Sequence, residues 1–187
     1  MKQTAFFTFI LLMLGSTLSF AQKKSSGSGG AGYQTAAGLR AGGYSSGVTV
    51  KHFLSGKNNV AFEGLVTTEY RARGARVTLL LEKHHPIKEV KGLQFYYGAG
   101  AHLGFYRGRY YFDDVRYYKG RKYEVYRAYY YDDHMYITPG ADLILGLEYK
   151  MEDLPFVLGV DYKPFFEVFD GYAGLYNDAA VSLRFAF

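Results

Sequence analysis

The sequence predicts an all-β fold, an eight-stranded antiparallel up-and-down barrel. Apolar and polar residues alternate with period two in eight segments from residue 34 onward, with exceptions such as Leu65 and Ile144. No stretch keeps helical spacing, and no apolar run approaches the length of a membrane-spanning helix. Most segments are close to the ~9–11 residues that a tilted transmembrane strand needs, and an even number of such strands closes into a barrel.

The first 21 residues predict a signal peptide. Lys2 provides a positive charge, residues 5–14 are apolar, and Ser19 and Ala21 are the small residues that a signal peptidase reads. The apolar run is far shorter than the ~20 residues of a spanning helix. We therefore expect cleavage after Ala21.

Residues 22–33 predict a flexible leader because they are rich in Gly and Ser, and the barrel is expected to cover residues 34–187. The chain has no cysteine, which excludes disulfides, thiolate metal sites and an attached lipid.

The predicted strands are separated by segments rich in Gly, Ser, Asn and Pro, such as residues 44–47, 55–58 and 151–155. The strands are expected at residues 34–43, 47–54, 60–70, 75–82, 93–105, 141–150, 156–168 and 181–187.

Alternation alone does not say which face of the barrel is inside. A soluble secreted ligand-binding barrel would place its apolar face inward. Here the polar face carries six basic and seven acidic residues, a near-neutral set that suits a closed interior. Aromatic residues lie toward strand ends on the apolar face, where a membrane interface would be, and the chain stops on a strand. These features favour an apolar face directed toward lipid.

The polar face is then expected to form a salt-bridged interior plug. Centred hairpins place Glu69 opposite Arg76 and Asp142 opposite Lys163, each a pair of opposite sign. The same register places Glu63 opposite Glu82, so a third group has to lie between them. The named plug residues are Arg40, Glu69, Arg76, Asp142, Lys163 and Arg184.

Three segments, residues 38–43, 95–102 and 139–149, resemble recurring segments of short outer-membrane β-barrel proteins. The alternation that ends at Phe187 resembles the C-terminal signal read by the outer-membrane assembly machinery of Gram-negative bacteria. Residues 34–187 as a whole resemble a small barrel of the OmpX and OmpA-transmembrane-domain type. The resemblance implies a bacterial outer-membrane location, contact with the assembly machinery during insertion, and no reaction.

With both termini in the periplasm, the odd-numbered gaps between strands are expected to face outward: residues 44–46, 71–74, 107–134 and 170–177. Eight strands enclose space only for their own side chains, so no open channel is expected.

The third outward gap, residues 107–134, has nine Tyr, seven Arg or Lys and five Asp or Glu. Tyr and Arg favour contact surfaces, and the cations suit lipopolysaccharide phosphates, so lipopolysaccharide or a protein are the expected partners. The predicted interaction residues are Tyr110, Tyr111, Arg116, Tyr117, Tyr118, Arg121, Tyr126 and Tyr130. Alternatively, the segment extends its two flanking strands beyond the bilayer to a turn near residues 119–121. The two interpretations are compatible.

Asp113, Asp114, Asp132, Asp133 and His134 provide oxygen and imidazole groups for a divalent cation. Acidic residues clustered in a loop are usually only solvated, so the sequence predicts no metal site and no cofactor.

An outer-membrane rim enzyme, a lipid A-modifying enzyme or protease, is the alternative function. Ser45, Ser46 and His134 lie in outward gaps, but no motif links them, and we expect no catalysis. His102 lies mid-strand on the polar face, whereas His84 is expected at a periplasmic strand end. Nucleic acid is not an expected partner because the excess positive charge lies in the leader and the third gap.

Overall fold

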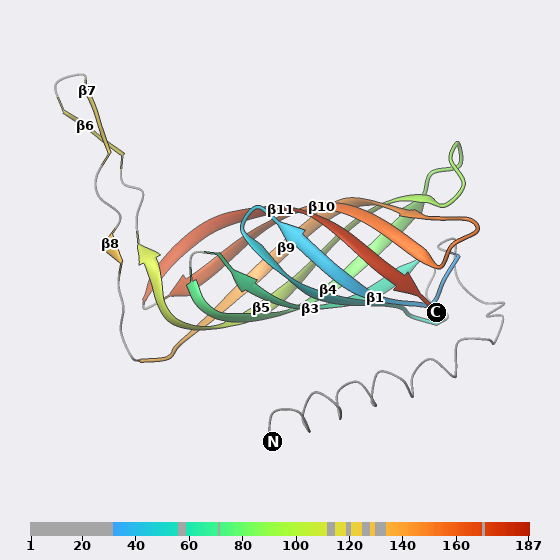
Figure 1. Ribbon diagram of the computed structural model, residues 1–187, viewed down its shortest axis with the longest axis horizontal. Coiled ribbons are helices and arrows are strands. Elements are labelled where there is room, and N and C mark those ends of the chain that lie inside the picture. The colour runs from blue at the N-terminus through green and yellow to red at the C-terminus, as the bar shows by residue number, and fades with distance from the viewer. Residues whose placement is uncertain are drawn as a thin grey trace, which may run out of the picture.

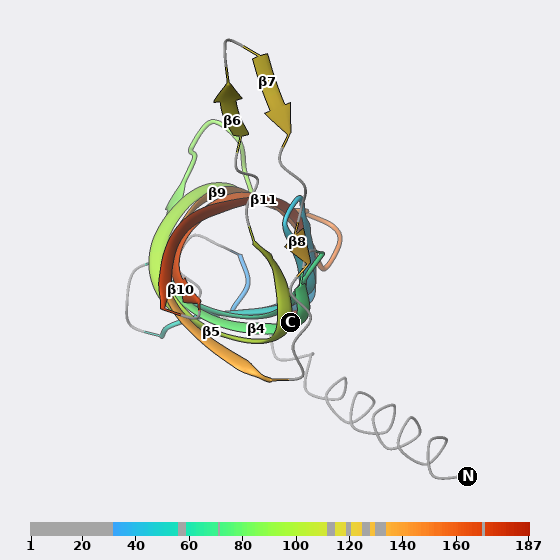
Figure 2. The same ribbon diagram turned by 90° about the vertical axis from the view of Figure 1, so that its left-hand side faces the viewer.

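The computed structural model describes residues 32–55, 59–70, 72–111, 115–118, 121–124, 128–129, 134–169 and 171–187. Eight antiparallel strands close into a barrel in the order β1-β2-β3-β4-β5-β9-β10-β11, and β11 pairs with β1 (Figures 1 and 2). The barrel strands are β1 (Thr35–Gly42), β2 (Ser45–Phe53), β3 (Val60–Glu69), β4 (Ala72–Pro86), β5 (Leu93–Tyr111), β9 (Tyr136–Lys150), β10 (Phe156–Phe169) and β11 (Tyr172–Ala186). The predicted all-β barrel is confirmed.

The barrel is polar inside and apolar outside. Leu39 is 68% exposed, whereas Lys51 and Glu63 are fully buried. This distribution follows from the alternation, because successive side chains of a strand point to opposite faces. Among the described residues no helix is long and apolar enough to cross a membrane.

The two ends of the barrel differ in their connections. Both chain ends of the barrel lie at one end, called the terminal end, where the backbones of Thr35 and Phe187 exchange two hydrogen bonds. The other end is called the loop end. The connections at residues 43–44, 70–71, 112–135 and 170–171 lie at the loop end, and the other three lie at the terminal end (Figure 1).

Most strands extend farther toward the loop end than the alternation indicated, as three of them illustrate. β4 begins at Ala72, β9 at Tyr136 and β11 at Tyr172. The expected gap over residues 170–177 is therefore wrong, and only residues 170–171 connect β10 to β11, with Gly171 at φ 79°. The outward residues of this part of β11 include Asn177, which broke the apolar pattern that defined the predicted strand.

The predicted register of two hairpins is wrong by two residues. Arg76 lies opposite Thr67 and not opposite Glu69, and Asp142 lies opposite Phe165 and not opposite Lys163. β3 ends at Glu69 and β4 already begins at Ala72, which moves the centre of the first hairpin, whereas in the second hairpin Lys150 pairs with Val157 and Phe156 belongs to the turn side of the register.

A two-stranded sheet projects from the loop end, apart from the barrel (Figure 1). It consists of β6 (Val115–Tyr118) and β7 (Arg121–Glu124), with Tyr118 opposite Arg121. β8 (Ala128–Tyr129) pairs with the end of β5. β5 therefore continues past the expected end at Phe105, as the strand-extension interpretation predicted, whereas β6 and β7 form a separate sheet.

Candidate functional site

The barrel interior holds five buried Lys or Arg side chains and eight buried Asp or Glu side chains among the described residues. The near-neutral balance expected from the sequence is therefore wrong. Lys150 does not contribute, because it is only half-buried and its Nζ donates to the carbonyls of Met151 and Leu154. Asp178, which was expected in a loop, is buried inside. Carboxyl side chains outnumber Lys and Arg side chains inside the barrel, and these groups gather in three clusters.

The first cluster, at the terminal half, is centred on Lys51. Its Nζ lies 2.7 Å from Glu82, 3.2 Å from Glu148 and 3.5 Å from Glu63. Arg184 adds a second cation, 2.5 Å from Glu63 and 3.4 Å from Glu148. Buried charges need such counter-charges because water is excluded. The expected pairing of Glu63 opposite Glu82 is wrong, because Glu82 lies opposite Ala61. The two carboxylates nevertheless share Lys51, which is the third group expected between them.

An apolar layer seals the terminal end below this cluster. Tyr33, which precedes β1, packs edge-on against Phe53 with ring centroids 5.1 Å apart. Its hydroxyl donates to Glu148 at 2.5 Å. Burial and the Glu148 carboxylate raise the pKa of the Tyr33 hydroxyl well above its ordinary value, so the hydroxyl stays a donor. The remaining residues of the layer are Ala36, Ala61, Val157 and Ala186.

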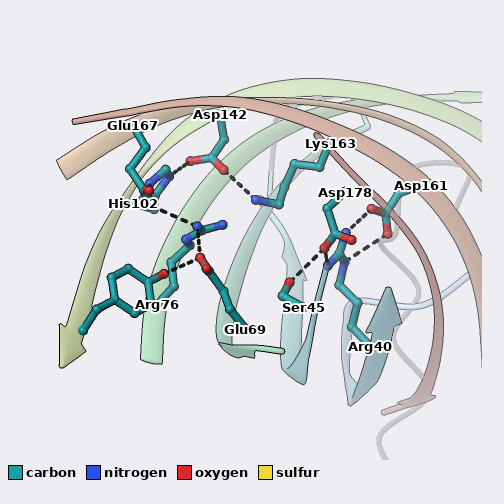
Figure 3. Close-up of polar contacts among 11 residues, drawn as sticks. Arg40, Ser45, Glu69, Arg76, His102, Asp142, Asp161, Lys163, Glu167 and Asp178 are labelled. Atoms are coloured by element: carbon teal, nitrogen blue, oxygen red, sulfur yellow. Dashed lines mark hydrogen bonds and ion pairs between the residues drawn. The ribbon is translucent and has the colours of Figure 1, made fainter. Parts of the chain in front are cut away.

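The second cluster, at mid-height, is centred on Arg40 (Figure 3). Its guanidinium lies 2.6 Å from Asp161 and 2.8 Å from Asp178. The Ser45 hydroxyl and the Tyr44 backbone N–H also donate to Asp178, at 2.8 and 2.9 Å. Asp178 therefore ties the β1–β2 connection to β11.

The third cluster, at the loop half, has Arg76 between two carboxylates from different strands. Arg76 forms ion pairs with Glu69 of β3 and, at 3.0 Å, with Glu167 of β10 (Figure 3). The Tyr106 hydroxyl donates to Glu69 at 2.6 Å. Arg76 and Glu69 meet diagonally, because long side chains reach the neighbour two residues away across a strand pair.

His102 joins this third cluster through both ring nitrogens. Nδ1 lies 2.6 Å from Asp142 and Nε2 lies 3.3 Å from Glu167 (Figure 3). Carboxylates only accept hydrogen bonds, so this geometry suits an imidazolium that donates from both nitrogens. Lys163 completes the cluster 2.6 Å from Asp142, again diagonally.

An apolar layer on one side of the lumen separates the first and third clusters. It consists of Leu65, Leu80, Tyr96 and Ile144, all at most 3% exposed. Leu65 and Ile144 are two of the residues that broke the alternation. They place apolar side chains inside the barrel, where they fill space between charged groups.

The predicted interaction residues lie in or near the projecting segment. Tyr110 and Tyr111 are in β5, Arg116, Tyr117 and Tyr118 are in β6, and Arg121 is in β7. Tyr126 and Tyr130 lie outside the described residues.

The candidate cation ligands Asp113, Asp114, Asp132 and Asp133 also lie outside the described residues. In the described part of the chain, no group of three or more His, Cys, Asp or Glu side chains is arranged to hold a metal ion. Of the serines considered for catalysis, Ser45 is buried and donates its hydroxyl to Asp178.

Sequence reasoning missed several interior residues, among them Tyr33, Ser45, His84 and Asp178. His84 lies two residues before the end of β4, near the expected place, but its side chain is buried inside the barrel with Nε2 3.1 Å from the Glu82 carboxylate. Extending the alternation of β4 by two residues would have placed it inside. The other three lie in predicted loops or in the leader, where the alternation gave no signal.

Comparison with known proteins identifies the fold. No family model matches the chain, and no curated protein matches its sequence. The N-terminal β-barrel domain of Pseudomonas aeruginosa OprF is similar in structure, with TM-score 0.57 and 14% identity over 83% of this chain and 99% of that one. Neisserial surface protein A is also similar, with TM-score 0.53 and 12% identity over 82% of this chain and 95% of that one. The chain therefore has the fold of small eight-stranded barrels.

Proposed function

We propose that the protein is an integral barrel of the bacterial outer membrane with a structural and surface-contact role. The termini face the periplasm, and the loop end faces the outside of the cell. The segment of residues 107–134 makes the contacts, and the interior conducts no ions. The mature chain begins at Gln22, after removal of the signal peptide.

The observation that carries the proposal is the contrast between the two faces of the barrel. A continuous apolar surface from all eight strands is exposed, whereas 22 polar or charged side chains among the described residues are buried. A soluble ligand-binding barrel would have the opposite arrangement. In lipid the outward apolar face needs no further cover, and the pairing of β11 with β1 closes the sheet, so that its paired region has no open edge.

The packed lumen supports the absence of conduction. Two apolar layers and three charged clusters occupy the interior from Tyr33 at the terminal end to Tyr106 at the loop half. Planar-bilayer recordings of the purified protein should show no unit conductance. Stable open channels would overturn this part of the proposal.

The position of the third connection supports the contact role. It lies at the end opposite the termini and carries a sheet that stands apart from the barrel (Figure 1). Its Arg and Lys residues suit lipid phosphates, and its Tyr residues suit protein contacts.

Surface proteolysis tests location and orientation together. The protein should be recovered in outer-membrane fractions and should migrate faster on gels before heating than after. Trypsin added to intact cells should cut within residues 107–134 and leave the barrel uncut, and a variant lacking residues 112–134 should resist. Recovery as a soluble periplasmic protein, or cleavage only after permeabilisation, would contradict the proposal.

Photo-cross-linking from position 117 in cells tests the contact role. Tyr117 should cross-link to lipopolysaccharide or to a protein, whereas position 143, on the outward barrel face, should give only phospholipid products. Equal products from both positions would contradict a dedicated contact segment.

A further inference from the structure

The β1–β2 connection lies farther from the loop end than the first residues of the neighbouring strand β11. β1 ends at Gly42, opposite Ala180, whereas β11 continues toward the loop end as far as Tyr172. On its other side β11 pairs with β10 along this whole length. Within the described part of the chain, residues 172–178 of β11 therefore have a strand on one side only.

The hydrogen bonds of the paired region fix the direction of each backbone group on this edge. Thr35 and Phe187 bond each other, and the Gly43 N–H donates to the Ala179 carbonyl. Odd-numbered residues of β11 therefore point their N–H and C=O toward β1. Even-numbered residues point toward β10, as the bond from the Ala186 N–H to the Pro155 carbonyl shows.

The antiparallel pattern repeats every two residues, so the open edge presents the backbone groups of Ala173, Leu175 and Asn177. All three residues are exposed, and the Leu175 side chain is 81% exposed. An unpaired edge of this kind is a template for an added strand.

A cavity of about 310 Å³ lies at the base of the edge, where β1 would continue. Its wall includes Asp178, whose carboxylate is fixed by Arg40, Ser45 and the Tyr44 backbone. A volume of this size accommodates a side chain. The lining residues are Gly43, Tyr44, Tyr70, Asn177, Asp178 and Ala179.

We propose that the β11 edge binds an extended peptide segment of another protein, which adds as an antiparallel strand above β1. Ala173, Leu175 and Asn177 each present one N–H donor and one C=O acceptor, and this arrangement matches the backbone of an extended peptide. One peptide side chain enters the cavity beside Tyr44 and Tyr70, and an apolar one lies beside Leu175. Residues 172–179 contain no Lys or Arg, so nothing on the strand recruits an acidic peptide.

Other occupants fit this edge less well. Acyl chains offer no hydrogen-bonding groups to the three backbone sites. Antiparallel pairing of this edge with a second copy would place one barrel upside down in the membrane; this argument rests on the proposed membrane location. The first residue of β1, to which the leader of this chain is joined, lies at the opposite end of the barrel.

A tethered peptide tests the proposal without knowledge of the natural partner. The chain has no cysteine, so Ala179→Cys provides a single attachment point beside the cavity. The probe is a peptide of alternating threonine and valine, joined by disulfide through an N-terminal cysteine and a glycine linker. Tethering raises its effective concentration to the millimolar range.

Amide hydrogen exchange is then measured by NMR in lipid nanodiscs. The amides of Ala173, Leu175 and Asn177 should exchange about tenfold or more slowly with the peptide attached. The amides of Gly174 and Tyr176 should not change, because they already face β10. A matched peptide that is N-methylated at alternate residues should give no protection.

Two proline variants test the directions assigned to the backbone N–H groups of β11. Leu175→Pro should preserve the folded, heat-modifiable barrel and abolish peptide-dependent protection, because it removes an N–H that only the added strand uses. Tyr176→Pro should destabilise the barrel, because its N–H pairs with β10.

Each other outcome overturns the proposal. Equal protection by both peptides would indicate a non-specific contact. Protection by lipid alone would assign the edge to lipid, and doubling of the particle mass would assign it to a second copy of the chain. Failure of the untethered protein to enter nanodiscs would instead contradict the proposed membrane location.

Discussion

The two ends of the barrel are built differently. At the terminal end, the strand ends are closed by an apolar layer around Tyr33 and Phe53, directly below the Lys51 cluster. At the loop end, β1 stops at Gly42 while β5 continues to Tyr111, so the rim is uneven, and among the described residues part of β11 has a neighbouring strand on one side only. The terminal half is organised for stability, and the loop half leaves backbone and side chains available for contact.

The largest effect is expected at the terminal end, from Lys51→Met. The substitution removes the cation on which three buried carboxylates converge. Breaking a buried ion pair costs about 3–5 kcal/mol, and the loss here involves several pairs at once. We expect no heat-modifiable form in detergent refolding, or a large fall in the urea midpoint. A variant with the stability of the unsubstituted protein would show that the clusters do not stabilise the terminal half.

Glu69→Ala should have a smaller effect, at the loop end. Arg76 loses one carboxylate but keeps Glu167, and Tyr106 loses its acceptor. We expect a loss of about 3 kcal/mol in the free energy of unfolding, at the lower end of values for a broken buried pair. Glu69→Gln, which keeps an acceptor, should recover part of the loss. A loss as large as that of Lys51→Met would remove the difference between the two ends.

Tyr33→Phe tests the seal at the terminal end. It deletes one buried hydrogen bond to the Glu148 carboxylate and leaves the ring in place against Phe53. A hydrogen bond to a charged group contributes about 1.5–3 kcal/mol, so the urea midpoint should fall by a corresponding amount. Tyr33→Ala should lower it further, because the ring is also lost. An unchanged midpoint for both variants would mean that Tyr33 is not part of the seal in solution.

The smallest effect is expected from Lys91→Ala in the connection after β4. Its ion pair with Glu152 is 3.1 Å long but solvent-exposed. Exposed pairs contribute little because water and salt screen them. The urea midpoint should not change measurably. A shift comparable to that of Tyr33→Phe would show that the connections also stabilise the terminal end.

The barrel could be predicted from the sequence because each strand has an apolar face and a charged face. Ion-pair partners such as Asp142 and Lys163 were recognised even though the register was two residues off, because long side chains also meet diagonally. The sign of a pair is therefore a weak guide to register.

The residues that sequence did not predict lie where the alternation stops. Asp178 and Ser45 fall in segments that appeared to be loops, and they become interior only because β2 and β11 extend farther. Tyr33 lies in a Gly-rich leader, where its burial depends on a barrel mouth formed by distant strands. The open edge of β11 follows from unequal strand lengths, which no local pattern encodes.

The central claim is that lipid contacts the apolar outer face of this barrel while the charged clusters stay inside. NMR cross-relaxation between backbone amides and lipid acyl chains in nanodiscs measures this directly. We expect cross-peaks from the amides of Leu79, Leu145 and Val181, at mid-height on the outer face, and none from Tyr33 or from β6. Absence of acyl-chain cross-peaks at those three amides, with water cross-peaks in their place, would contradict the account.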